Sequence, residues 1–268
     1  MTGPSRPKYL APLITFLLLF GCSEEKKRVL EPVLAEVIDV NDIIPITDSL
    51  VAPILYKNIG GFDTLTVQEN KEKFIATILP AILIVKYRIR QDLIKIKSLI
   101  SEDYWYPEDS SFYLMQLKRF NASDSSDLIV RMHTHPNSIV LAQAAVESGW
   151  GTSRFFSQAN NLFGIWSYNP DRPRIAARSG NRTIHLRKYD DIAASIMDYF
   201  ETIARARAYR SFREARMQTD DVDELLPYLR SYSERKSEYV DQLRVIINHN
   251  NFKQYDHYQL DPQYFILQ

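Results

Sequence analysis

The sequence predicts an α+β fold that is mostly helical and carries one small β-hairpin. Apolar residues recur at helical spacing along much of the chain after residue 67, a glycine-centred polar turn interrupts that pattern near residue 180, and no internal repeat divides the chain. With 268 residues, 45% of them hydrophobic, the chain is long enough to bury a substantial core. We therefore expect one globular domain with an appendage.

Helical periodicity begins with the segment from Val67 to Ile100, which Pro80 is expected to kink or divide. Further helices are expected over Phe112 to Phe120, Ile139 to Val146, Ile192 to Ala206, Val222 to Leu229 and Glu238 to Asn248. Residues 174–189 indicate a hairpin, because Ser179-Gly180-Asn181 is typical of a tight turn.

The N-terminus has the pattern of a secretion signal. Arg6 and Lys8 precede an apolar run, Leu10 to Phe20, that is too short to span a bilayer. The run ends in Leu19-Phe20-Gly21-Cys22, which resembles the lipobox of bacterial lipoproteins, in which the cysteine carries the lipid. We expect residues 1–22 to be a signal peptide and Cys22, the only cysteine, to anchor the protein in a membrane. An inert thiol in a cleaved signal is the alternative.

This resemblance implies a place in the cell envelope, facing the periplasm, and Ser23 after Cys22 suits sorting to the outer membrane of a Gram-negative host. Lysines plus arginines equal aspartates plus glutamates, 33 each, so no net charge draws the protein to nucleic acid. Residues 23–65 are expected to be a tether and irregular lead-in, residues 66–252 the main domain, and residues 253–268 a C-terminal tail.

One nearly all-apolar helix carries the residues of most chemical interest. Its interior polar residues are Gln143 and Glu147, four apart and hence on one face, and its expected caps are Asn137 or Ser138 before it and Gly149 after it. Burial and the negative end of the helix dipole would both raise the pKa of Glu147. A protonated carboxyl can protonate the leaving oxygen of a glycoside, whereas the alternative is a carboxylate that faces solvent or pairs with Arg154.

Two motifs extend this interpretation. The first is Glu147-Ser148-Gly149-Trp150-Gly151-Thr152-Ser153-Arg154-Phe155, followed by Asn160-Asn161-Leu162-Phe163-Gly164-Ile165-Trp166, and the second is Tyr232-Ser233-Glu234-Arg235-Lys236-Ser237-Glu238-Tyr239-Val240. Both resemble motifs of the glucosaminidase domain family, glycoside hydrolase family 73, and within it the Bax-like proteins, over residues 74–252. The resemblance implies a lysozyme-like fold and hydrolysis of peptidoglycan after N-acetylglucosamine, with Glu147 as the general acid.

Tyr232 matches an active-site tyrosine of the family, which implies a hydrogen bond to the reacting sugar or to the attacking water. A tyrosine that only packs between helices is the alternative. Amide and aromatic side chains suit a sugar cleft, and those expected to line it are Gln143, Trp150, Asn160, Asn161, Trp166 and Tyr168. Trp150 fits a core position equally well.

Glycosidases usually use a second carboxylate, yet residues 175–188 contain none. Asp171 precedes the hairpin, and Asp190-Asp191 follows it in a pattern that favours the start of a helix. Alternatively, the acetamido group of the substrate attacks the anomeric carbon itself. His133 and His135 form a His-x-His pair without an evident third ligand, so a loop or capping role is favoured and no metal or organic cofactor is expected.

The hairpin region is rich in positive charge: Arg172, Arg174, Arg178, Arg182, Arg187 and Lys188. These side chains are either simply solvated or attract the carboxylates of peptidoglycan stem peptides. The sequence thus predicts a lipid-anchored endo-β-N-acetylglucosaminidase whose partner is the glycan strand of peptidoglycan. The alternatives are a muramidase or lytic transglycosylase, because one fold hosts several cleavages, and a non-catalytic wall-binding lipoprotein.

Overall fold

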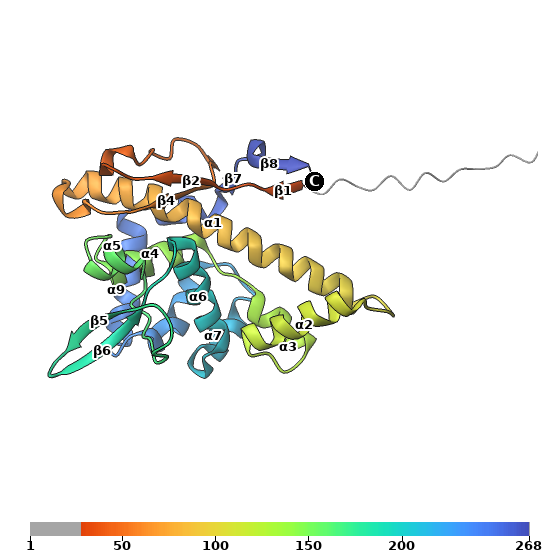
Figure 1. Cartoon of the computed structure of the whole chain (residues 1–268). Coiled ribbons are helices and arrows are strands. Elements are labelled where there is room, and N and C mark those ends of the chain that lie inside the picture. The colour runs from red at the N-terminus through yellow and green to blue at the C-terminus, as the bar shows by residue number, and fades with distance from the viewer. Residues whose placement is uncertain (1–27, 268) are drawn as a thin grey trace, which may run out of the picture.

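A computed structural model of the chain describes residues 28–267 and confirms a mostly helical α+β fold with a small hairpin (Figure 1). Cys22 and the rest of the expected signal peptide lie outside the described residues. The helices are α1 (Val67–Ile100), α2 (Pro107–Phe120), α3 (Ser125–Met132), α4 (Asn137–Ser148), α5 (Arg154–Ala159), α6 (Ile192–Arg205), α7 (Arg210–Ala215), α8 (Val222–Leu225) and α9 (Ser237–His249). Short 3-10 turns include η4 (Leu226–Tyr232) and η5 (Phe252–His257).

The first helix, α1, is continuous over 34 residues, so of the two expectations for Pro80, a kink or a division, the division is wrong. Thr66 caps its start in a capping box with Glu69. A proline inside a helix costs about 3 kcal/mol or more. Nearly every side chain from Phe74 to Val85 is buried, however, and packing on all sides of the helix offsets the lost hydrogen bond. In Figure 1, α1 separates a thin layer of strands from the remaining helices.

The strands of that layer join the lead-in to the tail. They are β1 (Arg28–Leu30), β2 (Val33–Glu36), β3 (Leu50–Val51), β4 (Ile54–Lys57), β7 (Gln259–Leu260) and β8 (Phe265–Leu267). β1 pairs antiparallel with β8, whereas β2 pairs with β4 and β3 with β7 in parallel. Residues 28–65 therefore differ from the expected tether, because their apolar side chains, including the fully buried Ile43, complete the core against α1.

The central helix, α4, contacts α1, α9 and η5. As predicted, Gly149 ends it, with the positive φ of 58° that favours glycine. The predicted N-terminal cap is wrong, since α4 begins at Asn137 and has no side-chain cap of its own. Instead Asp256 of η5 accepts hydrogen bonds from the backbone N–H of Ser138, at 2.7 Å, and from its hydroxyl, at 2.8 Å. The tail thus caps the helix that carries Glu147.

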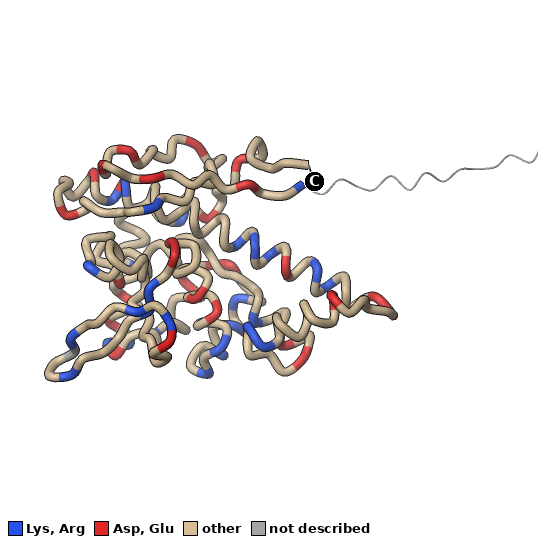
Figure 2. Tube along the Cα trace, in the orientation of Figure 1, with Lys and Arg blue, Asp and Glu red and all other residues tan. Residues whose placement is uncertain are grey.

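The predicted hairpin is confirmed as β5 (Arg174–Ser179) and β6 (Arg182–Arg187), joined by Gly180 and Asn181, with Gly180 at a positive φ of 58°. It projects from the body in Figure 1, and its Lys and Arg residues are visible along it in Figure 2. Asp198 of α6 anchors it by accepting hydrogen bonds from Arg187 and Tyr189. Within residues 28–267, no helix is both long and apolar enough to cross a membrane.

Candidate active site

Glu147 lies in the last turn of α4, where its side chain is half-buried. Burial raises the pKa of this carboxyl above its usual range, while a hydrogen bond from Tyr239 and the nearby positive charge of Arg235 act in the opposite direction. The hydroxyl of Tyr239 donates to Oε1 of Glu147 at 3.0 Å. No other hydrogen bond to this carboxyl is found among the described residues, so Oε2 remains available to a ligand.

The hydrogen bond between Tyr239 and Glu147 is the outermost of a buried series of hydrogen bonds. Gln143, one turn before Glu147 on α4, donates from Nε2 to the hydroxyl of Tyr239 at 3.0 Å. Its Oε1 accepts from the hydroxyl of Tyr199 on α6 at 2.6 Å. Both polar atoms of this fully buried amide are therefore satisfied, and the orientation of Gln143 is fixed.

This series of hydrogen bonds continues from Tyr199 into the protein interior and ends at the buried guanidinium of Arg216. The hydroxyl of Tyr199 lies 2.8 Å from Nε2 of His135, and Nδ1 of His135 lies 3.3 Å from Nη1 of Arg216. Because the Tyr199 proton is donated to Gln143, its oxygen must accept from Nε2–H of His135, which leaves Nδ1 to accept from Arg216. Burial and the charge of Arg216 hold the pKa of His135 well below its ordinary value, so the ring is neutral. Every donor thus points in one direction, from Arg216 toward Glu147.

Tyr232 lies at the end of η4, where its ring stacks on that of Tyr239 with centroids 5.6 Å apart and planes 5° from parallel. Burial, followed by the nearby negative charge of Glu147, raises the pKa of its phenol well above 10, so it is a hydrogen-bond donor and not a base. It borders a hollow of about 820 Å³ lined by residues 230–234, 236 and 237. The guanidinium of Arg235 lies 5.9 Å from the ring of Tyr239.

The structure buries two of the predicted sugar-lining residues and leaves a third, Asn160, half-exposed. Gln143 is fully buried behind Glu147. Asn161 is only 2% exposed, and its amide bonds the backbone of Ile165 and Arg187, which ties the segment after α5 to the hairpin. Asn160 donates to the carbonyl oxygen of Tyr189 at 3.0 Å. Hydrogen bonds to the protein occupy the amides of Gln143 and Asn161, so the role predicted for these two as sugar ligands is corrected to a structural one. For Asn160, whose Oδ1 has no hydrogen bond among the described residues, a role as a sugar ligand stays a prediction.

The predicted aromatic residues separate into two groups. Trp150 packs on Phe74 and Phe252, with ring centroids 5.5 and 5.9 Å apart, which favours the core position over the cleft. Trp166 and Tyr168 are 45% and 83% exposed, with ring centroids 6.2 Å apart. These two rings are accessible to a ligand beside the hairpin, although nothing in residues 28–267 links them by direct contact to Glu147.

No second carboxylate is hydrogen-bonded to Glu147 or its partners in the described part of the chain. Asp191 caps α6 by accepting from the backbone N–H of Ala194 at 2.7 Å, which confirms the helix-start interpretation. Asp171 lies in an exposed turn. His133 ends α3 as its C-cap, and His135 follows in the loop before α4, as expected of loop and capping residues.

Sequence reasoning missed the two residues that link the site to the protein interior, Tyr239 and Tyr199. The available signal was the Gln143–Glu147 pair itself, because two polar groups on one face of a buried helix require hydrogen-bonding partners from neighbouring elements. Tyr239 also stood in the second motif without an assigned role.

Comparisons with known proteins find similar sequences that include this site. Residues 126–252 match the family described as "Glucosaminidase: Mannosyl-glycoprotein endo-beta-N-acetylglucosaminidase". "Protein bax" of Escherichia coli (strain K12) is 26% identical over 201 residues, which cover 68% of this chain and 70% of that protein.

Two solved structures are also similar to parts of the chain. The catalytic domain of the autolysin Auto from Listeria monocytogenes is 21% identical with a TM-score of 0.39, covering 58% of this chain and 100% of that chain. The glycoside hydrolase domain of FlgJ from Salmonella typhimurium is 20% identical with a TM-score of 0.37, covering 51% of this chain and 87% of that chain.

The matched region begins in α3, contains Glu147, Tyr232 and Tyr239, and ends at Phe252, so it includes the whole hydrogen-bonded chain from Arg216 to Glu147. Residues 126–252 thus carry a glucosaminidase domain, and the chain is similar to the Bax protein of Escherichia coli over 201 residues.

Proposed function

We propose that this protein is a peptidoglycan hydrolase, an endo-β-N-acetylglucosaminidase that cleaves the glycan strand after N-acetylglucosamine with Glu147 as the general acid. The observation that carries the proposal is the state of Glu147. Its pKa is raised by burial, Oε1 is held by Tyr239, and Oε2 has no hydrogen-bonding partner among the described residues. A protonated Oε2 fixed in this way can donate to the glycosidic oxygen as the bond breaks.

The series of hydrogen bonds that runs from Arg216 to Tyr239 supports this role, because it fixes which carboxyl oxygen of Glu147 carries the proton. Because Tyr239 donates to Oε1, a proton on Oε1 would compete with that donor, whereas a proton on Oε2 keeps every hydrogen bond of the chain. Tyr232, a neutral phenol that stacks on Tyr239 and borders the hollow lined by residues 230–234, 236 and 237, can donate to the sugar or orient water. The acetamido group of N-acetylglucosamine supplies the attacking nucleophile in the substrate-assisted route, which requires no second carboxylate at this site.

Purified cell-wall sacculi test the activity. Loss of a general acid typically reduces the rate about 10²–10⁴-fold, so Glu147→Gln should lose turnover by that factor while still binding the wall. Glu238→Gln, which alters an exposed carboxylate at the start of α9, is the matched control and should retain full activity. Equal rates for Glu147→Gln and the parent would refute the proposal and favour a wall-binding protein.

Mass spectrometry of the released fragments tests which bond is cut. Hydrolysis after N-acetylglucosamine leaves that sugar at the new reducing end. Reducing N-acetylmuramic acid would identify a muramidase, and anhydro ends would identify a lytic transglycosylase.

The proposal extends to the location of the protein. A lipid on Cys22, resembling that of bacterial lipoproteins, would hold the domain on a membrane of the cell envelope, facing the wall. Cys22→Ala should move the protein from the membrane fraction to the soluble fraction of the envelope and abolish labelling with a radioactive fatty acid. Unchanged fractionation and labelling would contradict the anchor.

A further inference from the structure

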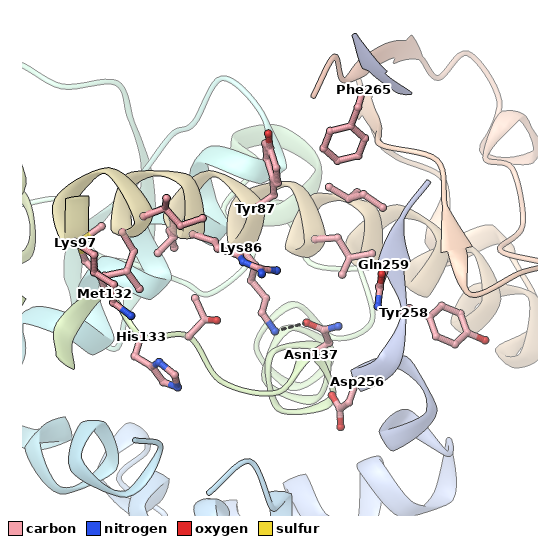
Figure 3. Close-up of a pocket in the computed structure, with 17 residues that line it drawn as sticks. Lys86, Tyr87, Lys97, Met132, His133, Asn137, Asp256, Tyr258, Gln259 and Phe265 are labelled. Carbon is pink, nitrogen blue, oxygen red and sulfur yellow. Dashed lines mark hydrogen bonds between the residues drawn. The ribbon is translucent and has the colours of Figure 1, made fainter. Parts of the chain in front are cut away.

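A cavity of about 730 Å³ lies at the opposite end of α4 from Glu147, between α1, the loop before α4 and the C-terminal tail (Figure 3). Asn137 lines it, and at 1.5 Å per residue Asn137 and Glu147 lie roughly 15 Å apart along the helix. Glu147, Tyr232 and Tyr239 are absent from its lining. This cavity is therefore separate from the proposed active site.

One wall of the cavity is a positively charged face of α1. Lys86, Arg90 and Lys97 all line it, at positions i, i+4 and i+11 of the helix. None of the three forms a salt bridge within residues 28–267. The carboxylate of Asp256 also lines the cavity, but both of its oxygens already accept hydrogen bonds from Ser138. The cavity therefore has more positive charge than its own carboxylate neutralises.

Lys86 is the innermost of these cations, and Figure 3 shows its side chain reaching down from α1 to Asn137. Its Nζ donates to the carbonyl oxygen of His135 at 3.0 Å and to Oδ1 of Asn137 at 2.7 Å, both of them neutral acceptors. An ammonium has three protons, so these bonds leave one for a ligand. Burial lowers the pKa of Lys86 to about 8, so most of it remains charged at neutral pH.

Much of the remaining surface of the cavity is apolar, although His133, Thr134 and Gln259 add polar groups to it. Leu93 and Ile94 extend the α1 wall, while Leu260 and Phe265 of the tail face it. Tyr87 and Phe265 meet edge to face, with ring centroids 5.3 Å apart, at one end of the cavity. A volume of about 730 Å³ falls within the range of about 300–1,000 Å³ that is typical of small-molecule sites. The lining thus offers cations along the α1 wall and hydrocarbon groups beside and opposite them.

We propose that this cavity binds an amphipathic anion whose carboxylate or phosphate contacts Lys86 and Arg90 and whose hydrocarbon part packs against Leu93, Tyr87 and Phe265. Charge complementarity selects this class of ligand. A cationic ligand would meet three like charges and an occupied carboxylate. A small hydrophilic anion would leave the apolar walls in contact with water.

Isothermal titration calorimetry of the folded protein tests the proposal, with probes that have a single hydrocarbon tail and are used below their critical micelle concentrations. Octanoate and octyl phosphate represent the two head groups, and their relative affinities distinguish a fatty carboxylate from a phospholipid-like phosphate as the natural source. We expect at least one of them to bind ten times more tightly than both inorganic phosphate and octyltrimethylammonium. Failure of both anionic probes to bind, or equal binding of the cationic probe, would overturn the proposal.

Surface variants assign the binding to this cavity. Arg90→Gln/Lys97→Gln changes two exposed side chains, so folding should be preserved, and it should weaken binding of the anionic probe at least tenfold. Arg88→Gln, an exposed arginine of α1 outside the cavity, is the matched control and should bind like the parent. Unchanged affinity in the double variant would refute the site. Glu147→Gln should also bind like the parent, which makes this test independent of the proposed hydrolase activity.

Discussion

Tyr239→Phe tests whether the buried hydrogen-bond chain controls the acid. The substitution removes one hydroxyl, which donates to Glu147 and accepts from Gln143, and leaves an aromatic ring that can still stack on Tyr232. The hydroxyl stabilises the ionised form of Glu147, since a donor to a carboxylate favours its charge. Its removal should therefore raise the pKa of Glu147 further.

Two magnitudes follow from the contacts. Gln143 is fully buried, so its Nε2 loses its acceptor without gaining water, and an unsatisfied buried donor costs about 1–3 kcal/mol of unfolding free energy. A neutral hydrogen bond contributes about 1 kcal/mol. If the loss of this bond raises the activation free energy by that amount, because the Glu147 carboxyl is no longer held in position, the maximal kcat/KM should fall about fivefold. The acid works only while protonated, so the alkaline limb of the pH profile should move to higher pH.

The assay is the pH profile of kcat/KM on solubilised glycan strands, together with denaturant unfolding. Tyr113→Phe, which removes a hydroxyl with no hydrogen-bonding partner among the described residues, is the control for the loss of a phenol and should change neither measurement. A partly unfolded enzyme would scale the whole profile without moving its limb. An unmoved limb, or one moved to lower pH, would refute the link between Tyr239 and the protonation of Glu147.

Three further predictions concern the scaffold. Ile43→Ala should lower the unfolding free energy by about 2–5 kcal/mol because this side chain is 0% exposed. Its control, Ile44→Ala, changes a side chain that is 62% exposed and should alter the unfolding free energy by no more than about 0.5 kcal/mol. Equal effects would show that the lead-in does not contribute to the core. Asp191→Ala should lower the unfolding free energy by about 0.5–2 kcal/mol by removing the cap of α6, while hydrolysis stays intact. Its control, Asp190→Ala, should change neither stability nor activity. A loss of activity in Asp191→Ala would instead make Asp191 a catalytic carboxylate. Because the pKa of Glu147 is raised in the folded state, its carboxyl stabilises the fold at low pH, and this stabilisation is lost as the pH rises through the folded pKa. Glu147→Gln should therefore become progressively more stable relative to the parent as the pH increases above about 4.5. A stability difference independent of pH would show that Glu147 titrates normally.

The sequence predicted the elements whose evidence is local. The helical periods, the Gly180 turn and the Gly149 cap all depend on residues close together in the chain. The structure confirms them, except that the helix expected over Val222 to Leu229 is α-helical only to Leu225 and continues as a 3-10 turn. The Gln143–Glu147 pair was likewise placed on one face by its spacing, and burial does raise the pKa of Glu147. The possible division of α1 at Pro80 did not occur, because burial on all sides of the helix outweighs the missing hydrogen bond.

The remainder depends on contacts between distant segments. Tyr199 and Tyr239 reach Gln143 from helices that follow it by dozens of residues, and Asp256 caps α4 across a separation of 118 positions. Short strands such as β1 and β3 have almost no sequence signal of their own, because their pairing partners are at the other end of the chain. The amide of Asn161 suggested a sugar ligand by its chemistry, yet its environment uses it to hold the backbone.

The pairing of β1 with β8 places Arg28 directly opposite Leu267, so the first and last described residues are neighbours on one edge of the fold. In Figure 1 this edge lies far from the tip of the β5–β6 hairpin. A short linker from Leu267 to Arg28 would therefore close the polypeptide of residues 28–267 without distorting it, and new termini could be opened at Gly180. Such a circular permutant should fold with the same core, and a reporter domain fused directly before Arg28 or after Leu267 would emerge from the same side, well away from the hairpin.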